Sequence, residues 1–213
     1  MTTNEITRVL HELKLPGMAS CWNSLEETHQ LDKLTLREGM RQMMQYERDT
    51  RQDNRIQRLI KNANFRLKAS IEELETDTTR GIAASNVSDL ATGNYITNGM
   101  TMIITGPAGT GKTYFACVLG DRACREGVKV LYFTMNMLIE NLKLVHLEGR
   151  ETNFFRKVNS HDLLIIDDFG YSVFLITPIF ATIYLITGDE YVINRSNFFN
   201  LSGLLGLLLS RYI

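Results

Sequence analysis

The sequence predicts an α/β fold in which a parallel sheet follows an all-helical region. From about residue 100, short apolar segments alternate with segments of helical pattern. The apolar segments lie at residues 100–105, 128–134 and 163–167. Buried strands that alternate with helices are typical of a parallel sheet. Residues 1–80 differ from this part, because they are rich in charge, poor in glycine and helical in pattern.

In the first region, each predicted helix has a recognisable boundary. Residues 4–13 form a helix that ends before the Pro16-Gly17 pair, and residues 18–29 form a second helix. The Thr35-Leu-Arg-Glu38 series is a capping box, in which the threonine and the glutamate satisfy free N–H groups at a helix start. We therefore expect a long helix from this point to about residue 62.

Composition divides the chain into four parts. We expect a helical domain at residues 1–80, a polar linker at residues 81–99 and the α/β core at residues 100–170. The last part, residues 171–213, is a tail of very low charge and an atypical pattern. Further helices are predicted at Ser70-Ile-Glu-Glu73, which reads as a helix start, and at residues 112–126, 136–147 and 151–158.

Overall composition argues against several classes of protein. With 213 residues, 44% of them hydrophobic, and a formal net charge of −1, the chain can bury a core, and any basic surface must be local. The three cysteines form no CxxC pair and no signal-peptide pattern is present, which favours reduced thiols in the cytoplasm. No histidine pair has the HExxH spacing of a metalloprotease. The uncharged run at residues 171–188 is interrupted by Pro178, so we expect no membrane span.

The most specific motif is a phosphate-binding loop. Residues 106–113 match the pattern G-x-x-x-x-G-K-[ST] at every fixed position, between a predicted strand and a predicted helix. Its glycines let backbone N–H groups approach phosphate oxygens. The N-terminus of the following helix also attracts these negatively charged oxygens. Lys112 is expected to reach the β- and γ-phosphates, and the Thr113 hydroxyl is expected to bind Mg²⁺. The candidate nucleotide-binding residues are Gly106, Pro107, Ala108, Gly109, Thr110, Gly111, Lys112, Thr113 and Tyr114.

A second motif supplies the acidic half of such a site. The segment Leu163-Leu-Ile-Ile-Asp167-Asp168 has the form of a Walker B strand, four apolar residues followed by two carboxylates. Asp167 is the expected metal-side carboxylate, acting through a coordinated water. Asp168 is expected beside the γ-phosphate, where it would orient the attacking water as general base. Lys112 and Asp168 are thus the candidate catalytic residues.

Together the two motifs predict phosphoryl transfer from a nucleoside triphosphate with Mg²⁺. Hydrolysis, transfer to a small molecule and binding without turnover all remain open, and the second carboxylate favours hydrolysis.

Four segments of the chain carry a likeness to known proteins. They are Leu13-Lys-Leu-Pro-Gly-Met-Ala19 with Trp22, Arg58-Leu-Ile-Lys-Asn-Ala-Asn-Phe-Arg-Leu67, the loop at residues 106–113, and residues 163–170. In this combination they resemble the IstB-like, or DnaC-like, ATPases of the AAA+ class. The resemblance implies a P-loop NTPase fold for the core and ATP as the nucleotide.

The resemblance also implies a function. Many members of this family are helper proteins of insertion sequences, which bind double-stranded DNA as ATP-dependent homo-oligomers and stimulate a transposase. Close relatives load the replicative helicase, but the Leu-Pro-Gly-Met opening points to the transposition branch. A catalytically impaired nucleotide-binding remnant and a small-molecule phosphotransferase are two further readings of the same residues.

The likeness to this family stops near Gly170. Members continue with a polar helix, a fourth strand ending in a sensor residue, an arginine finger and a final strand. Residues 181–187 faintly resemble the fourth strand but follow Gly170 too soon, and neither Arg195 nor Arg211 has the context of an arginine finger. Because an arginine finger can contribute roughly 10³–10⁵ in rate, its loss would leave binding possible and hydrolysis very slow.

A basic stripe is predicted on the long helix. At 100° per residue its arginines fall within an arc of about 100°, and they are Arg37, Arg41, Arg48, Arg51, Arg55 and Arg58. Lys61, Arg66 and Lys68 extend the basic character. Such a stripe could follow DNA phosphates without reading sequence; the alternative is a solvated helix face, partly neutralised by acidic neighbours. The candidate DNA-binding residues are Arg48, Arg51, Arg55 and Arg58.

Overall fold

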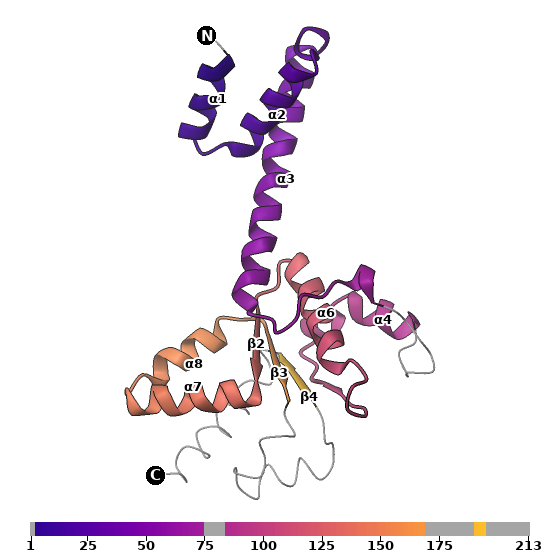
Figure 1. Cartoon of the computed structure of the whole chain (residues 1–213), viewed down its shortest axis with the longest axis vertical. Helices are drawn as coiled ribbons and strands as arrows, with labels where there is room; N and C mark the ends of the chain where they lie inside the picture. Colours follow the sequence, from indigo (N-terminus) through magenta and orange to yellow (C-terminus); the bar gives the residue numbers. More distant parts are fainter. Residues whose placement is uncertain (1–2, 75–83, 169–189, 195–213) are drawn as a thin grey trace, which may run out of the picture. The chain divides into compact units, whose positions relative to one another are not determined.

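The computed structural model describes residues 3–74, 84–168 and 190–194 (Figure 1). It divides into two compact units, residues Met1–Arg58 and Leu59–Ile213. Most of the tail expected at residues 171–213 lies outside the described residues, including the strand-like stretch at 181–187 and both Arg195 and Arg211. Within the described ranges, none of the helices combines the length and the hydropathy that crossing a bilayer requires.

The first unit is built from helices close to the predicted ones. α1 (Thr3–Glu12) and α2 (Pro16–Glu27) are followed by a short 3-10 helix, η1 (Leu31–Lys33), and by the first part of α3 (Leu36–Ala63). The capping box at the start of α3 is confirmed. The Thr35 N–H donates to Glu38 Oε2 at 2.9 Å, and the Glu38 N–H donates to Thr35 Oγ1 at 3.3 Å.

Pro16 and Gly17 do more than end the first helix, because they also begin α2. Proline suits the first helical turn, where its missing N–H costs nothing. Gly17 allows a close approach to α3, since a Cβ at this position would lie 2.6 Å from the Glu47 Cα and 2.8 Å from the Tyr46 carbonyl oxygen. The Pro-Gly pair thus sets where α2 packs on α3.

A buried glutamate on α3 completes this contact. Glu47 is only 6% exposed, and its Oε2 accepts the N–H groups of Gly17 at 2.7 Å and Met18 at 3.1 Å. Arg51 Nε donates to Glu47 Oε1 at 2.6 Å. Burial alone would raise the pKa of Glu47, but Arg51 and the two N–H groups outweigh it and lower that pKa. The carboxylate therefore satisfies free N–H groups at the start of α2.

The described residues of the second unit form a sheet of four strands in the order β1-β4-β3-β2. Its strands are β1 (Met102–Ile104), β2 (Val130–Thr134), β3 (Leu163–Asp167) and β4 (Glu190–Asn194). β2 and β3 pair in parallel, and β4 pairs antiparallel with both β1 and β3. It follows that β1, β2 and β3 run in one direction, as the sequence predicts.

β4 is an addition to the three predicted strands. It comes from the tail, where the sequence predicts no strand at these residues, and its antiparallel direction makes the sheet mixed. Its sequence holds consecutive Tyr, Val and Ile, which suit a strand. The backbone groups of β1 and β3 need partners, and a strand of either direction can supply them.

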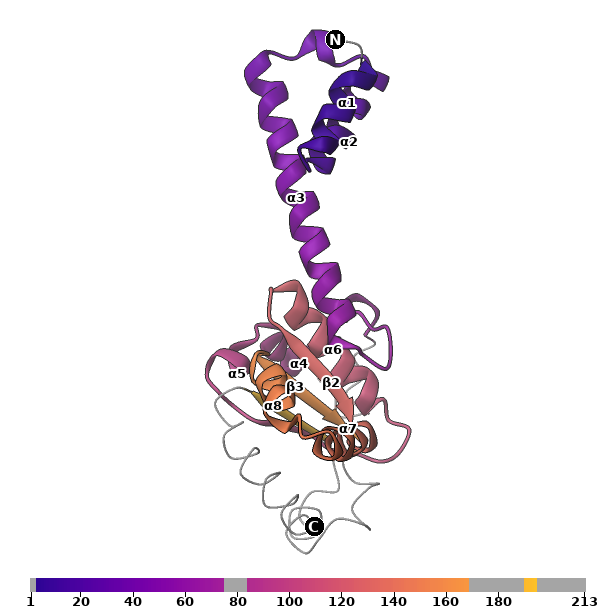
Figure 2. The ribbon, with the colours of Figure 1, turned by 90° about the vertical axis from the view of Figure 1, so that its left-hand side faces the viewer.

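Helices cover both faces of the sheet. α6 (Lys112–Arg125) lies on one face, and α7 (Met135–Leu147) and α8 (Glu151–Asn159) lie on the other, in front of the strands in Figure 2. Successive residues of β2 and β3 alternate between the two cores, so all of their apolar side chains are buried. Such burial on both faces is typical of parallel strands that lie between two layers of helices.

Part of the stretch predicted as a linker, residues 81–99, is folded. It contains α4 (Ala84–Ala91) and the short α5 (Asn94–Thr97). Val87 and Tyr95 are buried there, against residues of α6 and of the strands. The predicted helix start at Ser70 gives only the 3-10 helix η2 (Ile71–Glu73), although the Ser70 side chain does accept the Glu72 N–H.

Gly17→Ala is expected to destabilise the first unit by about 1–3 kcal/mol, because the added Cβ overlaps backbone atoms of α3. Thermal unfolding of the full chain, followed by the fluorescence of its single tryptophan, Trp22 on α2, measures this loss.

Gly39→Ala is the matched control. Gly39 also lies in a helix, but a Cβ there meets nothing within 4 Å. This variant should gain roughly 0.5–1 kcal/mol from helix propensity. Equal behaviour of the two variants would contradict the close approach of α2 and α3.

Candidate functional site

The phosphate-binding motif forms the connection between β1 and α6, as predicted. Gly109 and Gly111 have φ angles of 80° and 91°, in the left-handed region that side chains with a Cβ rarely adopt. A Cβ at either residue would meet nothing within 4 Å. Backbone conformation, and not crowding, therefore requires glycine at these two positions.

The other candidate nucleotide-binding residues line the same loop and the first turn of α6. Pro107 and Ala108 are exposed, and Thr113 and Tyr114 are half-buried. Lys112 Nζ donates to the carbonyl oxygens of Gly106 at 2.8 Å and Pro107 at 3.1 Å. The ammonium group therefore lies over the loop, at the N-terminus of α6, where helix geometry also favours an anion.

Asp167 ends β3 beside this loop and has no solvent exposure. Its Oδ1 accepts the Thr113 hydroxyl at 3.1 Å and the Asp168 N–H at 2.8 Å. Its Oδ2 accepts the Tyr132 hydroxyl from the neighbouring strand β2. Burial, followed by the contact with Asp167, raises the pKa of Tyr132, so the phenol stays a donor.

The Thr113–Asp167 pair fits a magnesium ion by its chemistry. A hydroxyl and a carboxylate are hard oxygen donors, and Mg²⁺ is typically held by one or two such protein ligands together with substrate phosphates. Lys112 and the loop N–H groups would hold those phosphates. The two motifs that the sequence predicts to cooperate are thus brought together, although 54 residues separate Thr113 from Asp167.

Asp168 has a partner that the sequence does not predict. Arg66 Nη1 donates to Asp168 Oδ2 at 2.8 Å and lies 3.9 Å from Asp167 Oδ2. Asp168 itself adopts a left-handed φ of 55°, which aspartate tolerates better than most residues. The nearby Asp168 carboxylate raises the pKa of Arg66. Arg66 therefore lies at the nucleotide site, and not on the basic stripe that it was expected to extend.

Two residues of the site, Arg66 and Tyr132, escape sequence reasoning for different reasons. Tyr132 offers a weak signal, a hydroxyl two residues before the end of an otherwise apolar strand. Arg66 lies in a segment that carries the family likeness, but nothing in that segment indicates a contact with Asp168, 102 residues away.

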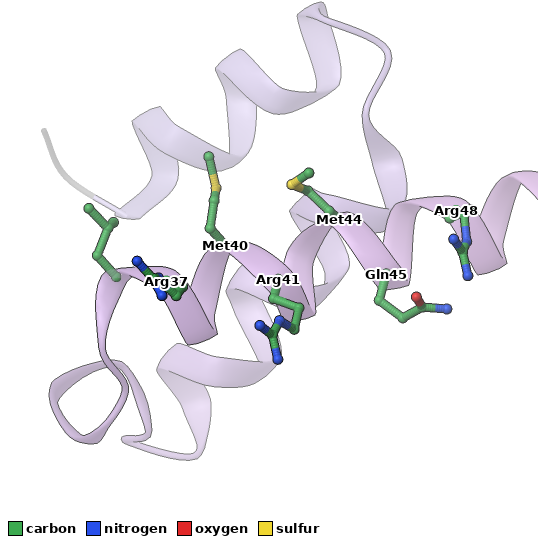
Figure 3. Close-up of a pocket in the computed structure, with 7 residues that line it drawn as sticks. Arg37, Met40, Arg41, Met44, Gln45 and Arg48 are labelled. Atoms are coloured by element: carbon green, nitrogen blue, oxygen red, sulfur yellow. The ribbon is translucent and has the colours of Figure 1, made fainter.

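The candidate DNA-binding arginines all lie on α3, but they are not equivalent. Arg51 holds Glu47 and also donates to the Lys14 carbonyl oxygen at 3.2 Å, so it has a structural role. Arg58 Nε donates to the Asn54 carbonyl oxygen at 3.1 Å. Arg48 lies at one end of an open hollow on α3, where Met40 and Met44 point away from the arginines in Figure 3. The hollow is lined by Leu36, Arg37, Met40, Arg41, Met44, Gln45 and Arg48.

Comparison with known proteins gives this site a family context. A family model of IstB-like ATP binding proteins matches residues 8–177. Over 174 residues the chain is 34% identical to a Pseudomonas fluorescens protein named as a putative ATP-binding protein of insertion sequence IS1162, with 80% of this chain and 74% of that protein aligned.

Two insertion-sequence ATP-binding proteins of Sinorhizobium fredii are also similar. The chain is 30% identical to y4pL, with 76% of this chain and 66% of y4pL aligned, and 28% identical to y4uH, with 80% and 68% aligned. It thus spans about two thirds to three quarters of the length of these relatives. The match of most of the chain to the family model, together with the 34% identity, shows that this protein belongs to the family of IstB-like ATP binding proteins.

Proposed function

We propose that this protein is an ATP-binding helper of DNA transposition that binds ATP with Mg²⁺, assembles on double-stranded DNA as a homo-oligomer and stimulates a transposase. Its membership in the IstB-like family and the names of its relatives, which refer to insertion sequences, support this reading. The same names favour transposition over helicase loading, the alternative within the class.

The observation that carries the proposal is the contact between Thr113 and Asp167 beside the phosphate loop. In this arrangement the loop N–H groups and Lys112 bind phosphates, and Thr113 and Asp167 bind Mg²⁺. The Lys112 ammonium now donates to two carbonyl oxygens. Phosphate oxygens are better acceptors for a cation, so they would replace those carbonyls at little cost.

Hydrolysis requires more of the site than binding does. Asp168 is the residue proposed to orient a water molecule, but its carboxylate is paired with Arg66 and must be released to act as a general base. Neither Arg195 nor Arg211, the tail arginines, belongs to the described residues. Because Asp168 is paired in this way, ATP binding is the central activity we propose, with hydrolysis following when the carboxylate is released. A catalytically impaired remnant is the alternative that the paired Asp168 favours.

DNA binding is proposed for the exposed face of α3 in the first unit. Arg48 and Arg55 are exposed, and Arg37 and Arg41 continue the same face toward the start of the helix. Guanidinium groups spaced along a helix suit a phosphate backbone and need no contact with the bases. Arg51 lies on the same helix with a side chain that is 61% exposed, but its ion pair with Glu47 already gives it a structural role, so it is left unchanged in the test below.

Lys112→Ala should weaken ATP binding roughly tenfold to a hundredfold, because hydrogen bonds from a charged group contribute about 1.5–3 kcal/mol. Equilibrium titration of the full chain with a fluorescent ATP analogue measures the change. Lys143→Ala removes the same charge from an exposed position on α7 and should leave the affinity unchanged. Unaltered affinity of the Lys112 variant would refute the loop assignment.

Asp168→Asn should retain ATP binding and abolish hydrolysis, because an amide cannot accept the proton of the attacking water. Phosphate release under saturating ATP and Mg²⁺ measures turnover. Where the unmodified chain hydrolyses ATP, equal turnover of the variant would exclude Asp168 as the general base; absence of turnover in the unmodified chain supports the catalytically impaired alternative.

The combined change of Arg48, Arg55 and Arg58 to Ala should lower DNA affinity and flatten its salt dependence. The slope of log affinity against log salt should decrease by roughly 0.9 for each phosphate that the variant no longer binds. The control changes Lys143, Arg156 and Lys157 of the second unit to Ala, which removes an equal charge. A salt-insensitive complex, or equal effects of both triple variants, would remove α3 from the DNA-binding surface.

A further inference from the structure

Arg66 is a cation at the acidic edge of the candidate nucleotide site that the proposed mechanism does not use. Its Nη1 lies 2.8 Å from Asp168 Oδ2 and 3.9 Å from Asp167 Oδ2. Its side chain is 52% exposed, whereas Asp167 is fully buried. The guanidinium group thus reaches the site from its solvent side and is not packed into the core.

The backbone that carries Arg66 is firmly held. Phe65, the preceding residue, packs its ring against α6, where a Cβ on Gly120 would lie 2.5 Å from Phe65 Cε1. The same ring makes an edge contact with Tyr132, with centroids 6.2 Å apart. An anchored backbone and an exposed side chain are what a residue needs to exchange between neighbouring partners without a change of fold.

The chemistry of Arg66 suits a phosphate as well as a carboxylate. A guanidinium group donates a planar fork of N–H groups that matches both kinds of anion. Any phosphate oxygen that shared a metal ion with Asp167 would come within reach of a guanidinium already 3.9 Å from that carboxylate. Arginine residues from the same chain serve in this way in other nucleotide-hydrolysing proteins.

We propose that Arg66 is a ligand of the terminal phosphate of bound ATP, and that Asp168 competes with this phosphate for its guanidinium group. This inference rests on the proposed ATP binding and extends it. When the phosphate takes Arg66, the Asp168 carboxylate is released to orient water. The same exchange makes the site sensitive to the γ-phosphate, since ADP has no group that can remove Arg66 from Asp168.

The test compares the affinity of the full chain for ADP and for a non-hydrolysable ATP analogue, both with Mg²⁺. Arg66→Ala should weaken binding of the analogue about tenfold, as expected for a charge-assisted hydrogen bond, and change ADP binding by less than about twofold. Lys68→Ala, which removes an equal charge two residues away on an exposed side chain, should change neither affinity.

A second comparison isolates the competition. Asp168→Asn should strengthen binding of the ATP analogue, because Arg66 no longer has a charged partner to leave. If the gain arises from Arg66, it disappears when Arg66→Ala is added to Asp168→Asn. If Arg66→Ala does not fold, Arg66→Lys is the second variant. It keeps the positive charge but lacks the planar N–H groups of arginine, so it should lose less affinity for the analogue than is expected of Arg66→Ala.

Two results would overturn the inference, and a third would contradict the proposed function. Arg66→Ala could weaken ADP and the analogue equally or weaken neither, or the gain from Asp168→Asn could persist in the double variant; either result would show that Arg66 makes no contact specific to the terminal phosphate. If the unmodified chain binds neither ADP nor the analogue, the proposed ATP binding itself is wrong. This result is recognised in the unmodified chain, before any Arg66 variant is compared.

Discussion

The buried carboxylate of Asp167 is the constraint on which the rest of the second unit depends. An ionised group in the protein interior costs several kcal/mol unless hydrogen bonds compensate it. Here the compensation comes from three elements at once, the Thr113 hydroxyl of α6, the Tyr132 hydroxyl of β2 and the backbone N–H of Asp168. A shift of any one of them would remove a hydrogen bond from the buried carboxylate, so Asp167 couples the fold of the sheet to the geometry of the candidate nucleotide site.

The strand order explains why α6 has to provide one of these partners. β1 and β3 run in the same direction but are separated by β4, which places them roughly 10 Å apart, since adjacent strands lie about 4.8 Å apart. The carboxyl end of β1 is therefore too far from Asp167 to contact it directly. α6 crosses this gap, and the left-handed glycines of the loop allow the chain to turn into the helix so that Thr113 faces β3.

Most of the local sequence signals predict the local structure correctly, although the helix start predicted at Ser70 gives only a short 3-10 helix. The capping box at Thr35 predicts the start of α3, and the two nucleotide motifs predict both the strands and their shared edge. Signals fail where the partner is distant. Gly17 looks like a helix breaker, but its role depends on Glu47, 30 residues away. Arg66 looks like one more charge of a basic stripe, because periodicity describes one helix and contains nothing about a carboxylate 102 residues away. The direction of β4 could not be predicted either, since backbone hydrogen bonds accept both directions.

The two carboxylates of the site differ in how easily they can respond to a nucleotide. Lys112 and Arg66 balance the charges of Asp167 and Asp168, and a triphosphate brings more negative charge than one Mg²⁺ neutralises. Asp167 is fully buried and held by three donors, so it must remain in place. The Asp168 side chain is 34% exposed, and its described ion-pair partner is Arg66, which is itself half exposed. Of the two carboxylates, Asp168 is therefore the one that can respond to added negative charge, because its ion pair with Arg66 can rearrange without leaving a buried charge uncompensated. The proposed metal-binding part of the site is buried, so losing its partners would be costly, whereas the partly exposed ion pair beside it can exchange partners with water.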